Sequence, residues 1–267
     1  MDPVFIILKG DDYIESDPYC QQLQESGYLS FQVPPLSFEF VNIEQLTARL
    51  SQTDSYCGLV LTSTRAVEAC QRACASDSKL FNVVAAKLLF PVGPKTFEAL
   101  NAAFNSSTID EQIVNSLGSA ESLASAIVKN FSDPIKSSGK PLLMPSSSIA
   151  KETIPSILSE KGIQVDCFAC YHTWPNPNLS QKLAQLLIEN KGKNIFMVLF
   201  SPSGVDSLRI ALDNLSTGVD RNRFKFIAIG KTTSKALSDL NWPIFCVSEK
   251  PNPISLYQSI AAAMDKE

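Results

Sequence analysis

Histidine is nearly absent from this chain, which has 267 residues and a single histidine, His172. Ser-His-Asp and Cys-His catalytic sets would both have to use that residue, and most zinc sites need more ligands of this kind than the chain offers. His172 also has a plain structural interpretation, as a polar residue at the end of a strand. The sequence therefore favours chemistry that needs neither a histidine base nor a metal ion.

The chain also lacks long apolar runs and an excess of positive charge. No uninterrupted apolar run approaches the roughly 20 residues of a membrane span, and the five-residue run at 4–8 follows no basic segment. The formal net charge is −4, whereas a nucleic-acid-binding surface needs a basic face. We therefore expect a cytoplasmic protein that binds neither membranes nor nucleic acid.

Paired cysteine motifs are scarce, although the chain has seven cysteines. Cys167 and Cys170 form one C-x-x-C, but no second such pair or histidine pair completes a metal site. In a chain without an export signal, scattered cysteines are expected to be reduced, and we predict that they are buried as small apolar residues. We expect no metal ion.

Two nucleotide-binding fingerprints are missing. No G-x-G-x-x-G occurs, and the Gly230-Lys231-Thr232 segment fails as a P-loop because Lys225 stands where that motif needs glycine. A nucleotide-dependent transferase is therefore disfavoured, and we expect no cofactor.

What the chain does contain is an internal duplication. Residues 60–67 and 198–205 both combine an apolar run, a serine turn and a helical pattern, and a second pair of motifs begins at Gly93 and Gly230. The separation is 138 positions from Ser63 to Ser201 and 137 from Gly93 to Gly230. A strand, a helix, a glycine at position 27 and a second strand follow one another in the first 33 residues. The same order recurs at 141–171, with Gly162 in place of Gly27. A nearly constant separation over several motifs indicates a duplicated α/β unit.

Short apolar strands alternate with helices along the whole chain, which predicts parallel sheets covered by helices on both faces. Ligands of such sheets bind beyond the carboxyl ends of the strands. Strands are predicted at 4–8, 28–33, 36–40, 58–61, 87–92, 141–144, 164–171, 195–200, 224–229 and 244–247, and helices at 19–25, 44–50, 64–74, 119–131, 151–161, 179–189, 205–212, 233–240 and 254–264. A helix is also expected from Gly93, and a loop at 132–140.

Five turns, at Ser63, Gly93, Ser146, Ser201 and Gly230, follow predicted strands and open helices. Amide groups at the start of a helix attract anions, although each turn can equally be a structural cap. Arg65 and Lys151 lie at or just after such turns, where they can bind carboxylates or simply lie in solvent. Tyr171 ends a strand. Its side chain acts either as a proton donor through the hydroxyl or as an aromatic ring that packs between neighbouring residues.

Taken together, these segments resemble the uroporphyrinogen-III synthase family. The resemblance follows the family's order along nearly the whole chain. Its segments are Val33 to Phe40, Leu61 to Ala69, Val92-Gly93 with Thr96, Gly118 with Ala120-Glu121, Tyr171-His172-Thr173, Phe200 to Gly204, and Ala228-Ile229-Gly230 with Thr232-Thr233. The chain departs from the family's pattern at Ser147 and Lys151, where the family often has glycine and arginine.

The resemblance implies a two-domain α/β fold. Two parallel-sheet domains of flavodoxin-like type are joined by two connectors, at Pro34-Pro35 and at Trp174 to Pro177, with a ligand cleft between them. One domain would comprise residues 1–36 and 174–267, and the other residues 37–173. The first strand–helix–strand unit would then pack with the Ser201 and Gly230 turns, a pairing that the sequence itself leaves open.

The resemblance also implies an activity, namely conversion of hydroxymethylbilane, a linear tetrapyrrole polycarboxylate, into uroporphyrinogen III with inversion of ring D through a spiro intermediate. This lyase needs no cofactor, and we expect a monomer. Tyr171 matches the residue that assists departure of the substrate hydroxyl, and Thr96 and Thr232 match a pair of threonines. The implied substrate-binding residues are Ser63, Arg65, Gly93, Thr96, Lys151, Ser201, Ser203, Gly230, Thr232 and Thr233.

A second hypothesis from another class is a non-catalytic two-lobed protein that binds a small anion. The two proline-rich connectors motivate it, since they would join two lobes. Retention of a phosphate or sugar ligand without turnover of the bilane would distinguish it from the synthase.

Overall fold

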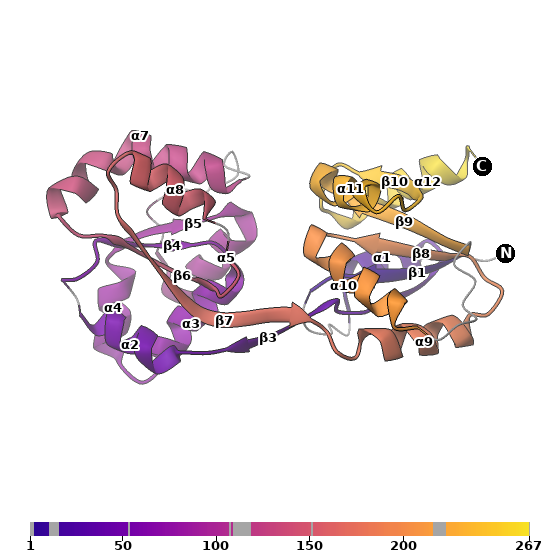
Figure 1. Ribbon diagram of the computed structural model, residues 1–267, viewed down its shortest axis with the longest axis horizontal. Helices are drawn as coiled ribbons and strands as arrows, with labels where there is room; N and C mark the ends of the chain where they lie inside the picture. The colour runs from indigo at the N-terminus through magenta and orange to yellow at the C-terminus, as the bar shows by residue number, and fades with distance from the viewer. Residues whose placement is uncertain are drawn as a thin grey trace. The chain divides into compact units, whose positions relative to one another are not determined.

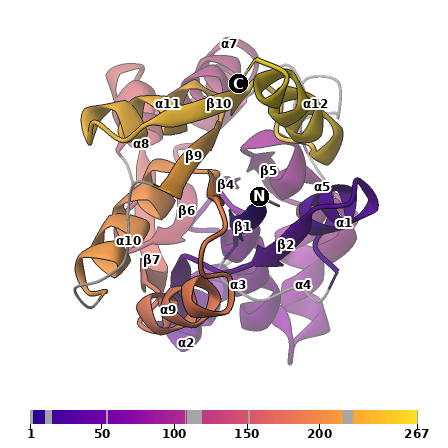
Figure 2. The same ribbon diagram turned by 90° about the vertical axis from the view of Figure 1, so that its right-hand side faces the viewer.

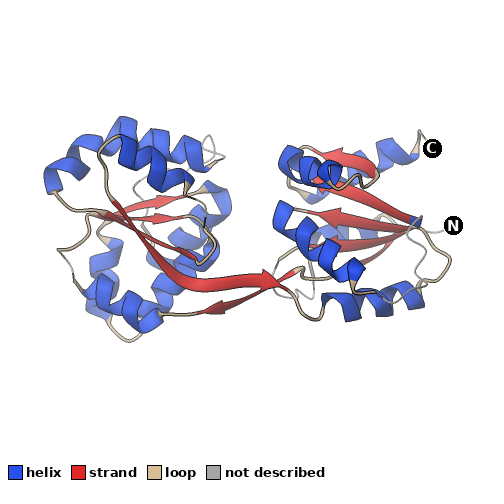
Figure 3. Cartoon of the chain, viewed as in Figure 1, coloured by secondary structure: helices blue, strands red, loops and turns tan. Residues whose placement is uncertain are grey.

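The chain folds into two compact α/β units, described from a computed structural model. Unit 1 comprises Met1–Ser37 and Trp174–Glu267, and unit 2 comprises Phe38–Thr173. The structure describes residues 3–10, 16–52, 54–106, 108, 119–150, 152–215 and 223–266. Figures 1 and 3 show that each unit has a central sheet with helices on both faces. None of the helices in the described ranges combines the length and apolarity that crossing a bilayer requires.

Unit 1 contains a five-stranded sheet in the order β10-β9-β8-β1-β2. All its pairings are parallel, and β1 lies directly beside β8 with Val4 opposite Ile195. Its elements are β1 (Val4–Leu8), α1 (Pro18–Glu25), β2 (Leu29–Gln32), α9 (Leu179–Glu189), β8 (Ile195–Leu199), α10 (Pro202–Asp213), β9 (Phe224–Ile229), α11 (Gly230–Asp239), β10 (Ile244–Ser248) and α12 (Pro253–Met264).

The central strands β1 and β8 of unit 1 are buried on both faces because they are wholly apolar. Alternate residues of β1 belong to two different cores: Val4 and Ile6 pack with α9, α10 and α11, whereas Phe5 and Ile7 pack with α1 and α12. Figure 2 shows these two groups of helices on opposite sides of the strands. Each such side chain contributes roughly 1.5–3 kcal/mol when it leaves water. The packing holds the carboxyl ends of the strands in fixed places.

Unit 2 contains a five-stranded sheet in the order β3-β7-β6-β4-β5. The pairings among β4, β5, β6 and β7 are parallel. Its elements are β3 (Leu36–Phe40), α2 (Ile43–Ser51), β4 (Gly58–Leu61), α3 (Thr64–Cys74), α4 (Ser78–Ala85), β5 (Leu88–Pro91), α5 (Gly93–Phe104), α7 (Ala120–Ser138), β6 (Leu142–Ser147), α8 (Thr153–Glu160) and β7 (Val165–Pro175). One core lies under α2, α3, α4 and α5, and the other under α7 and α8.

The two sheets share one arrangement. The order β2-β1-β8-β9 in unit 1 matches β7-β6-β4-β5 in unit 2. The chain supplies these strands in a different sequence, however, because β1 and β2 precede unit 2 whereas β6 and β7 follow β4 and β5. Each sheet therefore combines the first part of one repeat with the second part of the other.

The predicted element types and strand positions are confirmed, with four differences. The loop predicted at 132–140 is wrong, because α7 continues past Pro134 to Ser138. Proline removes one helical hydrogen bond, but Ile135 is buried in the core beside Phe131, which holds the last turn in place. Helix α4 was not predicted. The strand expected to end at residue 144 continues to Ser147, and the strand expected to end at residue 171 continues to Pro175.

Candidate functional site

Two serines begin equivalent helices at the carboxyl ends of their strands. Ser63 caps α3 after β4, and Ser201 caps α10 after β8. In each case the side-chain oxygen accepts a hydrogen bond from the amide three residues further on, Ala66 or Gly204, over 3.1 Å. Serine is a preferred residue for this cap because it satisfies an amide that has no partner within the helix. Both sequence-predicted turns therefore exist, with the same local geometry.

Two glycines begin the next helices of the two units. Gly93 and Gly230 have φ values of +76° and +77°, a region that residues with a side chain rarely adopt. No side chain caps either helix, since the preceding residues are Val92 and Ile229. A Cβ added at either glycine would find no atom within 4 Å. The first-turn amides of α5 and α11 thus have no side-chain acceptor at the capping position. Amides in this position can donate hydrogen bonds to a bound anion instead.

The threonines of these two helices differ in burial. Thr96 lies three residues after Gly93, and Thr233 lies three residues after Gly230. Both are buried, with 4% and 2% exposure, whereas Thr232 is exposed. Thr233 is therefore the positional equivalent of Thr96, whereas the pairing of Thr96 with Thr232 stays a prediction from the family resemblance. The constant separation of 137 positions already indicated Thr233.

Tyr171 is held in unit 2 by a β-bulge. Along the β6–β7 pair, Ser146 lies opposite Ala169 but Ser147 lies opposite Tyr171, so that Cys170 is an additional residue. Side chains normally alternate between the two faces of a strand. Here Cys170 and Tyr171 are both buried in the core under α2 and α3. The bulge thus turns Tyr171 toward the side of the sheet on which α3 begins.

The hydroxyl of Tyr171 meets the cap of α3. Its oxygen lies 2.8 Å from Ser63 Oγ, and its ring packs edge-on against Phe40. Burial raises the pKa of Tyr171, while the hydrogen bond to Ser63 and the positive charge of Arg65 oppose that shift. A tyrosine with a raised pKa stays protonated at neutral pH. Tyr171 is therefore a neutral phenol near pH 7, and its hydroxyl contacts the hydroxyl of Ser63.

Arg65 already has partners within unit 2. Its guanidinium carbon lies 3.5 Å from the centroid of the Phe38 ring, and its Nη1 lies 2.9 Å from a carboxylate oxygen of Glu68. Phe38 was not predicted as a neighbour of this site, although its alternating strand pattern indicated one face of a sheet. A substrate carboxylate at Arg65 would have to share it with Glu68.

The remaining predicted residues are divided between the units. Ser203 is exposed in the first turn of α10, with its Oγ 3.1 Å from Ser201 Oγ. His172 is exposed and its Nδ1 lies 2.7 Å from Ser148 Oγ, in keeping with a polar residue on a strand. Lys151 and Gly118 lie outside the described residues. In the described part of the chain, no group of three or more histidine, cysteine or acidic residues is placed to hold a metal ion.

All seven cysteines are free thiols; four are buried as expected, Cys57 and Cys246 are half-buried, and one is exposed. Cys167 is exposed, so the prediction of burial is wrong for this residue. The alternation of β7 explains it, because Cys167 points away from the core that receives Cys170. Burial raises the pKa of Cys170 to about 11, which keeps that thiol protonated near neutral pH.

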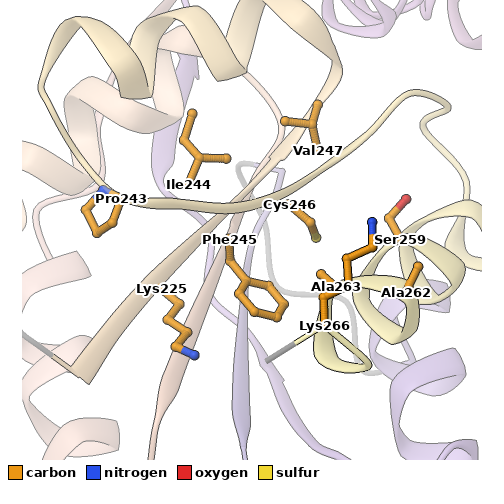
Figure 4. A pocket seen from close by; sticks show the side chains of 10 residues that line it. All are labelled: Lys225, Pro243, Ile244, Phe245, Cys246, Val247, Ser259, Ala262, Ala263 and Lys266. Carbon is orange, nitrogen blue, oxygen red and sulfur yellow. The ribbon is translucent and has the colours of Figure 1, made fainter.

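Among the hollows that lie within single units, two contrast in their lining. One, of about 460 Å³, is in unit 2 between β6, β7 and α8, and its polar lining includes Ser146, Ser147, Ser148 and Glu152. The other, of about 560 Å³, is in unit 1 along β10 and the end of α12. Figure 4 shows the Phe245 ring between Lys225 and Lys266 in this second hollow. It contains none of the residues predicted from the sequence, and Lys225 and Pro243 place it toward the amino ends of the strands.

Comparisons with known proteins agree on one family. A family model described as uroporphyrinogen-III synthase HemD matches residues 17–258. The uroporphyrinogen-III synthase of Schizosaccharomyces pombe is 26% identical over 249 residues, with 92% of both chains covered. That of Saccharomyces cerevisiae is 26% identical over 270 residues, covering 96% of this chain and 95% of the relative.

Solved structures agree with the fold. A uroporphyrinogen-III synthetase from Helicobacter pylori gives a TM-score of 0.63 at 12% identity, covering 100% of both chains. A mutant uroporphyrinogen III synthase from the extremely thermophilic bacterium Thermus thermophilus gives 0.62 at 17% identity, also covering 100% of both. At such identities the likeness concerns the fold alone, which is the two-unit α/β arrangement predicted from the sequence.

Proposed function

This chain belongs to the uroporphyrinogen-III synthase family, and we propose that it dehydrates and cyclises hydroxymethylbilane to uroporphyrinogen III. The family match over residues 17–258 carries the proposal. Relatives named for this activity, each 26% identical, align with more than nine-tenths of the chain. Members of the family are cofactor-independent lyases of tetrapyrrole biosynthesis that close the ring. The alternative, a non-catalytic anion-binding protein, is not favoured by these relatives.

The proposed reaction needs one proton to be delivered and one to be returned. Protonation of the terminal hydroxyl allows its C–O bond to break, so that water leaves and the pyrrole nitrogen supplies the electron pair of an azafulvene. The substituted carbon of ring D attacks this electrophile to form the spiro intermediate. Cleavage and reclosure then invert ring D and close the macrocycle with loss of a proton. The net change is release of one water molecule.

Tyr171 is the proposed donor of that proton. A phenol is protonated at neutral pH, and the hydrogen bond with Ser63 and the charge of Arg65 support the assignment because they oppose the rise in the pKa of Tyr171 that burial causes. The contact of its hydroxyl with Ser63 adds a second hydroxyl at the same point. The proton released when the ring closes can return to the phenolate, which restores the acid for the next turnover.

The helix starts in both units are proposed to bind the acetate and propionate groups of the substrate. Gly93 and Gly230 support this, because α5 and α11 begin without a side-chain cap. Ser201, Ser203, Thr96 and Thr233 add hydroxyl groups in the same turns, and Arg65 adds positive charge. Backbone amides of this kind bind carboxylates locally even though the net charge of the chain is −4. A contribution from Thr232 or Lys151 stays a prediction from the sequence.

Positioning is proposed to supply much of the catalysis, because uncatalysed closure gives the wrong isomer. Holding the reacting groups in the correct orientation lowers a barrier by up to roughly 7–11 kcal/mol. Action as a monomer and a cytoplasmic location are further proposals, based on the sequence.

The test is incubation of the purified full chain with hydroxymethylbilane, followed by oxidation and chromatographic separation of the porphyrin isomers. We expect isomer III to form faster than any product of a heat-denatured control. Isomer I alone, at the rate of the control, would contradict the proposal. A parallel binding measurement with inorganic phosphate tests the anion-binding alternative, which predicts tight retention without turnover.

A further inference from the structure

The Ser63 hydroxyl has more hydrogen-bonding capacity than the helix cap uses. A serine hydroxyl has one hydrogen to donate and two lone pairs to accept with. One lone pair accepts the Ala66 amide over 3.1 Å. The hydrogen and the other lone pair remain, and Tyr171 Oη lies 2.8 Å away. Because the amide can only donate, the cap leaves Ser63 free to donate its own hydrogen to Tyr171.

The equivalent serine of unit 1, Ser201, caps its helix without contacting a tyrosine among the described residues. Ser201 accepts the Gly204 amide over the same 3.1 Å, but its other neighbour is Ser203 Oγ at 3.1 Å. The cap therefore needs no tyrosine. The contact of Ser63 with Tyr171 is an addition found in unit 2, and it depends on the bulge at Cys170 that turns Tyr171 toward α3. β-Bulges often redirect a side chain beside an active site.

We infer that Ser63 is a positioning residue, which donates its hydroxyl hydrogen to Tyr171 Oη and so directs the phenol proton toward the leaving hydroxyl of the substrate. A phenol oxygen that accepts one hydrogen bond points its own O–H away from that donor. The same bond stabilises the phenolate that forms when the proton leaves. This inference rests on the proposed function, in which Tyr171 is the acid.

Other groups around Tyr171 act on its ionisation as well, so the test must isolate Ser63. Arg65 on α3 favours the phenolate, and the Cys170 thiol on β7 disfavours it. Phe40 on β3 contributes a ring without charge. Substitution of Ser63 alone leaves these three neighbours in place.

The experiment compares Ser63→Ala, Ser63→Thr and Ser201→Ala in the full chain. Steady-state kinetics of isomer III formation gives kcat and KM, and ultraviolet difference titration against Tyr171→Phe follows the phenolate of Tyr171 alone. Ser63→Ala is expected to lower kcat roughly three- to tenfold, the range for one hydrogen bond, with little change in KM. It should also move the titration of Tyr171 to higher pH, because the phenolate loses a donor.

Ser201→Ala is the matched control for the loss of a cap. Both alanine variants should lower the melting temperature, Ser63→Ala by more because it also removes the hydrogen bond with Tyr171, but Ser201→Ala should leave the titration of Tyr171 unchanged. Ser63→Thr keeps the hydroxyl and should restore both kcat and the titration. If Ser63→Ala does not fold, Ser63→Gly takes its place, since glycine at the cap costs only a few tenths of a kcal/mol relative to serine.

The inference is overturned if the Tyr171 titration is the same in wild type and Ser63→Ala, or if Ser63→Thr fails to restore kcat. Failure of the proposed function looks different. In that case wild type forms no isomer III, yet the titration still shifts in Ser63→Ala, because it measures the hydroxyl pair without substrate. Turnover without any shift would leave the function standing and remove the role of Ser63.

Discussion

The two units share the same scaffold but differ in the chemistry placed on it. Both have a serine-capped helix after one strand and a glycine-started helix after the next. In unit 2 the capping serine, Ser63, contacts Tyr171, whereas in unit 1 its equivalent, Ser201, contacts Ser203. Both units therefore carry the two helix starts, whereas the described residues place a buried tyrosine against the capping serine in unit 2.

The difference arises from strand geometry rather than from the repeated motifs. The bulge at Cys170 lies in the β6–β7 pair of unit 2, whereas the equivalent β1–β2 pair runs in regular register from Val4 to Ile7. An irregularity of one residue thus accompanies the tyrosine and decides which face it lies on. The comparison shows that the two halves of a duplicated protein can keep one fold while their capping serines acquire different partners.

The largest effect is expected from removing the Tyr171 hydroxyl. Tyr171→Phe should lower kcat roughly 10²- to 10⁴-fold, the usual contribution of general acid catalysis. Stability should change little, because the ring stays in the core and Ser63 keeps the Ala66 amide. The isomer assay gives the rate, and thermal unfolding gives the stability.

Tyr56→Phe is the matched control within unit 2. Tyr56 is also buried, and its hydroxyl bonds to Asp166 and Arg49. Its loss should destabilise the chain at least as much as the loss of the Tyr171 hydroxyl, with turnover retained. Equal turnover in wild type and Tyr171→Phe would show that the Tyr171 hydroxyl takes no part in the reaction. The proposed chemical difference between the two units would then be lost.

A smaller effect is expected at the two glycines, and it should be the same in both units. Gly93→Ala and Gly230→Ala each place a side chain at positive φ, which costs about 1–2 kcal/mol. Neither new Cβ meets an atom within 4 Å, so strain rather than collision sets the cost. Chemical denaturation should give similar free-energy losses for the two variants.

The kinetics of these glycine variants sharpen the comparison further. If both helix starts bind substrate carboxylates, both variants should raise KM more than they lower kcat. A rise in KM confined to one variant would assign carboxylate binding to that unit alone and remove the other turn from the site.

The sequence was most informative where the structure is decided locally. Apolar strands and the serine caps at Ser63 and Ser201 follow from short patterns, since a buried strand and a helix start each depend on a few neighbouring residues. The continuation of α7 past Pro134 was missed because it depends on packing of Ile135 in the core. A local pattern carries no such information.

The same limit applied to the site. Tyr171 and Ser63 are 108 positions apart, and no spacing in the sequence indicates that a bulge brings their hydroxyls together. The partner of Arg65 was also missed, although Glu68 lies one helical turn further along α3. The resemblance to a family supplied the identity of the residues, and the fold supplied their contacts.

The smallest effect on kinetics is expected at the threonines. Here the comparison of the units distinguishes between two neighbouring residues, Thr232 and Thr233. Thr96→Val and Thr233→Val remove one buried hydroxyl from equivalent positions, 4% and 2% exposed, with little change of volume. If each hydroxyl makes one hydrogen bond to the substrate, KM should rise roughly three- to tenfold in both variants. Thr232→Val is the adjacent control, because its exposed side chain is the structural equivalent of Lys95 rather than of Thr96. A larger rise in KM for Thr232→Val than for Thr233→Val would contradict the structural pairing and restore the one implied by the family resemblance.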